Sequence, residues 1–196
     1  MNLDAALPTS RLERGTPIAH ANPWSDSPVR LDSPALDVMT DLTRVKAATT
    51  HPATTLRQAE QIMIYKGVRM LFVVTDMPSI EGLITATDLR GDKQLRAVHE
   101  RNLRYDDLCV ADVMTELAAL DAIDYEHLRA AAVGNAIATL KKLGRNHLLV
   151  VEKATDRTPR RVRGVVSRSQ IERQLGTTIE ITPIASSFAE IERALG

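Results

Sequence analysis

An internal duplication constrains the fold more than any other feature of the sequence. Residues 37–42 (DVMTDL) recur as 112–117 (DVMTEL), 75 residues later, with a single Asp/Glu exchange. Further along, 82–85 (GLIT) match 164–167 (GVVS) at an offset of 82. An offset that grows in steps indicates insertions in connections between elements that are themselves kept. The pattern predicts two similar units around a shared core within 196 residues.

Both copies predict the same order of elements, β-α-β-β-α. Each has a helical apolar stripe that ends at a glycine, followed by continuous apolar runs typical of strands covered on both faces. In the first copy we expect these elements at 45–50, 54–67, 71–74, 82–84 and from Asp88 onward. In the second copy we expect them at 120–124, 133–144, 148–151, 164–166 and from Gln170 onward.

Four segments follow from this pattern. Residues 1–33 are expected to form an N-terminal extension, partly ordered at best, because prolines and polar residues occur there without periodicity. Residues 34–104 and 105–178 are the two repeats, and 179–196 form a tail. In the extension, Trp24 is either an anchor onto the body or a partner contact. In the tail we expect a short strand at 179–182 and a helix with the apolar stripe Phe188, Ile191 and Leu195.

Composition excludes several classes of protein. Lys and Arg together number 25, as do Asp and Glu, and only 3% of the residues are aromatic, which argues against a nucleic-acid-binding face. A single cysteine, Cys109, excludes a disulfide framework, and the histidines lack metal-ligand spacing. Nucleophile-elbow and phosphate-loop motifs are absent, so we expect no enzyme. Neither a secretory signal nor a membrane-spanning run is found, so we expect a cytoplasmic protein.

The ordered set Val-Met-Thr, short strand, Pro, Thr-Thr-Leu-x-x-Ala, Gly, apolar strand and Gly-Leu-Ile-Thr-x-x-Asp resembles the cystathionine-β-synthase (CBS) domain. The resemblance covers about residues 35–177 as two tandem copies, and 82–89 match best. It implies an α+β Bateman module, in which two β-α-β-β-α repeats pack with pseudo-twofold symmetry. Such modules bind AMP, ADP, ATP or S-adenosylmethionine in clefts between the repeats, and they usually regulate without catalysing.

Thr85 and Asp88 are the first candidate ligand residues. In Thr85-x-x-Asp88 a hydroxyl ends a strand and a carboxylate opens the next element. The hydroxyl can donate to a phosphate, helix-end amides favour an anion, and the carboxylate can accept hydrogen bonds from both hydroxyls of a ribose. The alternative is an ordinary helix N-cap, which stabilises a helix by about 1 kcal/mol without any ligand.

Further candidates lie at the strand starts. Arg69 stands where CBS proteins often place a phosphate-facing basic residue, and its counterparts are Asn146 and His147. The alternatives are a solvated charge for Arg69 and a hydrogen-bonded scaffold role for the other two. In the family, the backbone of the first strand contacts adenine, and the resemblance carries that role to Lys46, Ala47, Thr49, Asp121 and Ala122.

The second copy departs from the family pattern. Ser167 keeps the hydroxyl, but Gln170 replaces the expected carboxylate and accepts hydrogen bonds more weakly. Arg168 can partly compensate by attracting a phosphate. We therefore expect two unequal clefts, with the competent one at Thr85 and Asp88.

The leading hypothesis is a regulatory module that binds adenine nucleotides and transmits occupancy through repacking of its copies. The alternative is a structural or interaction module with vestigial clefts. We also expect a homodimer and a regulated protein partner. The basic segment 152–163 is expected to be a solvated hairpin, with a lid or a docking patch as the alternatives.

Overall fold

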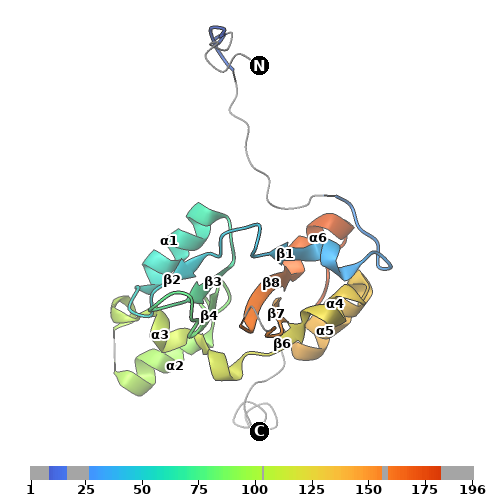
Figure 1. Ribbon diagram of the computed structural model, residues 1–196. Helices are drawn as coiled ribbons and strands as arrows, with labels where there is room; N and C mark the ends of the chain where they lie inside the picture. The colour runs from blue at the N-terminus through green and yellow to red at the C-terminus, as the bar shows by residue number, and fades with distance from the viewer. Residues whose placement is uncertain (1–8, 17–26, 103, 156–158, 182–196) are drawn as a thin grey trace.

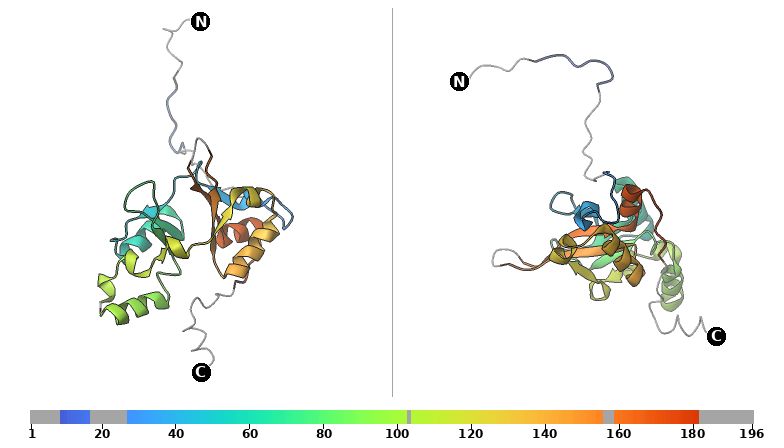
Figure 2. Two further views of the ribbon diagram at one scale, coloured as in Figure 1. Left: turned by 60° about the horizontal axis from the view of Figure 1, so that its bottom comes forward. Right: turned by 90° about the vertical axis from the view of Figure 1, so that its right-hand side faces the viewer.

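The computed structural model describes residues 9–16, 27–102, 104–155 and 159–181 as two lobes side by side (Figure 1, Figure 2). Each lobe is one four-stranded sheet with helices against it (Figure 1). The first half of the chain contains η1 Ala35–Val38, β1 Met39–Asp41, β2 Thr49–Thr50, α1 Leu56–Lys66, β3 Met70–Val73, β4 Gly82–Thr85 and α2 Asp92–Arg101. The second half contains η2 Tyr105–Asp107, α3 Val110–Val113, β5 Thr115–Glu116, η3 Leu117–Ala119, β6 Ala122–Asp124, α4 Tyr125–Arg129, α5 Val133–Leu143, β7 His147–Glu152, β8 Arg161–Ser167 and α6 Arg168–Leu175.

The two sheets exchange one strand each. Their orders are β2-β3-β4-β5 and β1-β8-β7-β6, so β1 of the first copy joins the second sheet and β5 of the second copy joins the first. Both exchanged strands run antiparallel to their new neighbours, and both come from the duplicated segments 37–42 and 112–117. The fold is therefore α+β, with two repeats related by pseudo-twofold symmetry, as predicted.

Each exchanged strand pairs with a strand that has a glycine at the point of contact: Gly82 in β4 faces β5, and Gly164 in β8 faces β1. A Cβ atom on Gly82 would lie 2.4 Å from the carbonyl oxygen of Thr115, and one on Gly164 would lie 2.8 Å from the carbonyl oxygen of Thr40. Real Cβ atoms do not approach other heavy atoms that closely, so only glycine allows each strand to pair at this distance. The repeated glycine is thus part of the exchange.

The core has three parts, one within each lobe and one between the sheets. In β3, Leu71 and Val73 face the core of the first lobe, while Met70 and Phe72 face the core between the sheets. The continuous apolar runs are therefore covered on both faces, as predicted. The inter-sheet core consists of Met70, Phe72, Val74, Leu83, Leu149 and Val165.

The helices that precede the buried strands confirm the predicted starts and stops. Thr55 caps α1 through a reciprocal hydrogen-bond pair with Gln58, and Gly67 ends it in the left-handed conformation with φ of 63°. Gly144 ends α5 in the same way, with φ of 59°. These caps satisfy backbone groups that the helix itself cannot pair.

Two expected elements differ in the structure. No helix opens at Asp88: residues 86–90 form turns, Gly91 is extended with φ of −103° and ψ of −177°, and α2 begins only at Asp92. Glycine favours such a break because its backbone is poorly suited to a helix interior. The expected strand at 179–182 is also absent from its described part, because Ile179 is buried in the second core and its N–H donates to Glu172. Trp24 and the stripe at 188–195 lie outside the described residues.

The segment before η1 packs on the second lobe. Val29 is buried in the core of that lobe, and Gln174 Nε2 donates to the carbonyl oxygens of Ser27 and Asp37, both at 3.1 Å. Part of the segment expected as an extension is therefore held to α6 by a buried amide. No helix among the described residues has the length and apolar character needed to cross a membrane.

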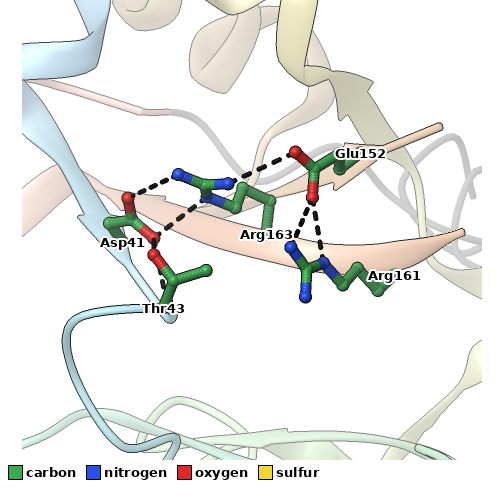
Figure 3. Close-up of polar contacts among 5 residues, drawn as sticks. All are labelled: Asp41, Thr43, Glu152, Arg161 and Arg163. Atoms are coloured by element: carbon green, nitrogen blue, oxygen red, sulfur yellow. Dashed lines mark hydrogen bonds and ion pairs between the residues drawn. The ribbon is translucent and has the colours of Figure 1, made fainter. Parts of the chain in front are cut away.

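A polar cluster holds β1 against β8 (Figure 3). Arg163 on β8 donates to both carboxylate oxygens of Asp41, each at 3.0 Å, and also pairs with Glu152 at 3.2 Å. Burial raises the pKa of Asp41, but hydrogen bonds from Arg163 and Thr43 and the charge of Arg163 lower it to about 2. β7 and β8 form the hairpin expected at 152–163, but Arg163 is held in this cluster and is only 21% exposed, so the hairpin is not solvated at this residue.

Candidate functional site

The open ends of two hairpins meet between the lobes. In the first lobe β3 begins and β4 ends there, and the Ala86 N–H donates to Arg69 O at 2.9 Å. In the second lobe β7 begins and β8 ends there, and the Arg168 N–H donates to Asn146 O, also at 2.9 Å. The same backbone bond in both repeats brings the predicted strand-start residues of both copies to one place.

Two adjoining pockets lie at this place, and Thr87, Asn146 and His147 line both. The first, which we call the acidic pocket, has a volume of about 160 Å³. Its lining combines the carboxylates Asp88 and Asp121 and one basic residue, Arg145, with an apolar wall. That wall consists of Leu83, Leu120, Leu143, Leu148 and Leu149.

The second pocket, the cationic pocket, has a volume of about 350 Å³. Three guanidinium groups line it, from Arg69, Arg90 and Arg168. Arg90 pairs with Glu60 at 3.4 Å and Arg168 with Glu172 at 3.3 Å, whereas no ion pair of Arg69 is found within the described part of the chain. The pocket therefore carries an excess of positive charge suited to phosphate.

The carboxylate of Asp88 is held in place from two sides. Its Oδ2 accepts from the Thr85 N–H at 2.8 Å and from Thr85 Oγ1 at 2.7 Å, and its Oδ1 pairs with Lys93 Nζ at 2.6 Å. The side chain is only 12% exposed but lines the acidic pocket. Because the Thr85 hydroxyl gives its proton to Asp88, it has none for a phosphate in this arrangement.

His147 lies between the two pockets. Burial lowers its pKa, and the positive charge of Arg69 adds to this effect while the negative charge of Asp88 opposes it, so that the pKa is about 4. The imidazole is therefore neutral near pH 7. A neutral ring beside Arg69 can donate one hydrogen bond to an anion without adding to the positive charge of the pocket.

The structure brings only some of the predicted site residues into the two pockets. Those that line a pocket are Thr85, Asp88, Asp121, Asn146 and His147 around the acidic pocket and Arg69 and Arg168 around the cationic pocket. Those that line neither are Lys46, Ala47, Thr49, Ala122, Ser167 and Gln170.

The expected second cleft has its polar groups engaged elsewhere. Ser167 caps α6 by accepting from the Gln170 N–H at 3.2 Å. Gln170 is buried, donates to Gln174 at 2.8 Å and accepts from Arg173. Ala47 packs against the inter-sheet core. A role for these residues in a second site stays a prediction.

Five lining residues with polar side chains were not predicted from the sequence: Thr87, Arg90, Thr115, Arg145 and Ser169. Arg90 follows Asp88 by two residues, and the turn at 86–90 directs this stretch along the cationic pocket. The sequence signal that could have predicted Arg90 is a basic residue two positions after the Thr-x-x-Asp motif. No group of acidic, histidine and cysteine side chains in the described ranges is arranged to hold a metal ion.

Comparisons with known proteins show which family and which solved structures this chain resembles. The family model described as CBS domain matches residues 35–92. A search of the curated proteins finds no match. Among solved structures, a conserved protein from Pyrococcus horikoshii aligns with a TM-score of 0.54 and 20% identity over 79% of this chain and 100% of its own.

Two other solved structures contain ligands. CBSX2 from Arabidopsis thaliana, in complex with AMP, aligns with a TM-score of 0.51 and 18% identity over 72% of this chain and 94% of its own. The CBS domain pair of MJ0100, in complex with 5′-methylthioadenosine and S-adenosyl-L-methionine, aligns with a TM-score of 0.50 and 19% identity over 76% and 98%. Residues 35–92 match the CBS domain family, and the chain as a whole has the fold of a tandem CBS pair.

Proposed function

We propose that the chain is a non-catalytic regulatory module that binds a phosphate-bearing adenine nucleotide in the two joined pockets. The observation that carries this proposal is the division of charge between them. The acidic pocket offers two carboxylates against one arginine, Arg145, beside apolar side chains, which suits a ribose and a base. The cationic pocket offers three arginines and no carboxylate, which suits phosphate. AMP in CBSX2 shows that a protein of the same fold holds such a ligand.

The charge of the cationic pocket favours AMP, ADP and ATP over S-adenosylmethionine. The sulfonium of S-adenosylmethionine is a cation, and a position beside Arg69, Arg90 and Arg168 is unfavourable for it. MJ0100 holds S-adenosyl-L-methionine, so ligand choice within this fold depends on the residues that line the pockets.

Calorimetric titration of the purified chain with AMP, ADP, ATP and S-adenosylmethionine tests the proposal. We expect heat with the three nucleotides and none with S-adenosylmethionine. Asp88→Asn keeps the size of the side chain but removes its charge, and it should weaken AMP binding about tenfold or more, because hydrogen bonds to a charged group contribute about 1.5–3 kcal/mol. Asp106→Asn, at an exposed position on η2, is the matched control and should leave the affinity unchanged.

The second candidate is an interaction module with an unused cleft. One observation favours it, namely that Thr85 and Lys93 already occupy both Asp88 oxygens. Absence of any nucleotide binding at millimolar ligand would select it. Exposed apolar side chains on α1, with Tyr65 90% and Ile64 66% exposed, are where we place a homodimer or partner contact under either proposal.

A further inference from the structure

Lys93 already fills one of the acceptor positions of the Asp88 carboxylate. A carboxylate offers about four acceptor positions. On Asp88, the Thr85 N–H and hydroxyl fill two positions on Oδ2 and the Lys93 ammonium fills one on Oδ1 at 2.6 Å, which leaves one. Two vicinal hydroxyls that both donate to Asp88 need two positions, so they can bind together only after Lys93 has left.

The same ammonium connects three parts of the molecule. Besides Asp88 it donates to Thr115 Oγ1 at 3.0 Å and to the Val113 carbonyl at 3.4 Å, so its three N–H groups are all engaged. Lys93 lies in the first turn of α2, Val113 ends α3, and Thr115 begins the exchanged strand β5. One side chain thus joins the Asp88 turn and α2 to the strand that the second repeat supplies.

The position of Lys93 allows it to leave. Its side chain is 45% exposed, so the ammonium can turn into water at little cost in solvation, and ion pairs at such sites contribute at most about 1 kcal/mol. α2 lies at the outer end of the first lobe, next to α3 (Figure 1, Figure 2). α2 packs Ala97 and Val98 against the core of the first lobe, and none of its described side chains belongs to the inter-sheet core, so its movement loosens only the former.

We propose that Lys93 is a built-in competitor of the nucleotide, and that ribose binding at Asp88 releases α2 from β5. This inference rests on the proposed function and adds its regulation. Occupancy of the acidic pocket breaks the three Lys93 contacts together, because one ammonium makes all of them. The free form holds α2 against the exchanged strand, and the bound form frees it.

Lys93→Met tests the competition, because methionine keeps an unbranched apolar stem without the ammonium. We expect Lys93→Met to bind AMP about two- to fivefold more tightly than the wild type, the factor that removal of an exposed ion pair allows. 2′-Deoxy-AMP has one ribose hydroxyl, which fits the remaining position, so its affinity should be equal in both proteins. Lys141→Met, exposed on α5, is the matched control and should change neither affinity.

Equal or weaker AMP binding by Lys93→Met, or an equal gain with 2′-deoxy-AMP, would overturn the competition while leaving the proposed function intact. Absence of AMP binding by both proteins would overturn the proposed function and this inference with it. Hydrogen exchange supplies a readout without ligand: residues 92–101 should exchange faster in free Lys93→Met than in the free wild type. Unchanged exchange there would overturn the release of α2.

Discussion

His147 should make the protein lose stability as the pH falls below 6.5. Its pKa is about 4 in the folded chain, against 6.5 for the free side chain. Between these values the unfolded chain binds a proton that the folded chain does not bind, so protons favour unfolding, and above pH 6.5 neither state is affected. One pKa unit corresponds to about 1.4 kcal/mol. The loss attributable to His147 therefore reaches about 2.5 kcal/mol at pH 4.5 and ends near 3 kcal/mol below pH 4.

Urea denaturation of the wild type and of His147→Gln at pH 7.5 and 4.5 measures this loss. Carboxylates also titrate in this range, so the informative quantity is the difference between the two proteins in how much stability they lose. We expect His147→Gln to lose about 2.5 kcal/mol less than the wild type, equal to about 5–10 °C in melting temperature for a chain of this size. His99→Gln, at an exposed position on α2, should lose as much as the wild type. Equal losses for His147→Gln and the wild type would refute the assigned pKa shift.

The same residue links nucleotide binding to protons. A phosphate beside His147 favours the imidazolium, so a bound nucleotide should raise the pKa of His147 above about 4 and binding should take up protons. Affinity for AMP should then increase as the pH falls toward the pKa of the complex. Calorimetry in buffers of different ionisation enthalpy measures the proton uptake. Because the phosphate itself titrates at about pH 6, the informative quantity is the difference in uptake between the wild type and His147→Gln, and no difference at pH 5.5 would place the phosphate away from His147.

Two other substitutions test how the exchanged strands are held. Asp41→Asn removes the charge that Arg163 pairs with. The lowered pKa of Asp41 limits the contribution of this charge to the free energy of unfolding to about 2.5 kcal/mol at neutral pH. Screening by solvent at the sheet edge reduces the expected loss of stability to about 1–2 kcal/mol. This stability is present above pH 4 and is lost as the pH falls from 3.8 toward 2, whereas Glu116→Gln, the exposed counterpart on β5, should change little. Gly82→Ala should lower the free energy of unfolding by about 2 kcal/mol or more, since its methyl group would lie 2.4 Å from the Thr115 carbonyl oxygen. A variant as stable as the wild type in urea denaturation would contradict the strand exchange.

The lobes could be predicted because their signals are local. Apolar spacing closed by Gly67 and by Gly144 marks both helices, and the runs at 71–74 and 148–151 mark strands buried on two faces. The exchange of β1 and β5 had no comparable signal, because strands of three and two residues are too short to show a period. The strands with which β1 and β5 pair are determined by contacts throughout the fold.

The part of the candidate site that lies at equivalent positions in the two repeats could be predicted from the sequence. Arg69, Thr85 and His147 were named from the repeated motif and the CBS resemblance, and the structure brings them together because the hairpin ends of the two lobes meet. The turn at 86–90 was not predicted, since a helix start and a turn closed by Asp88 have the same Thr-x-x-Asp pattern. This one difference directs Arg90 along the cationic pocket, and it leaves Lys93 in the first turn of α2, where its ammonium reaches Asp88.

The exchange also decides which motion a ligand could select. Leu83 lines the acidic pocket and is paired with Thr115 of β5, so the wall of the pocket includes residues of both repeats. A ligand shifts an equilibrium only if it binds two arrangements unequally. Sliding of one lobe past the other would disturb the inter-sheet core, which is closely packed and costly to rearrange. Release of α2 disturbs the contacts of Lys93 and the packing of Ala97 and Val98 on the first-lobe core but leaves the inter-sheet core intact, so we expect regulation by this module to act first through the outer helix of the first lobe.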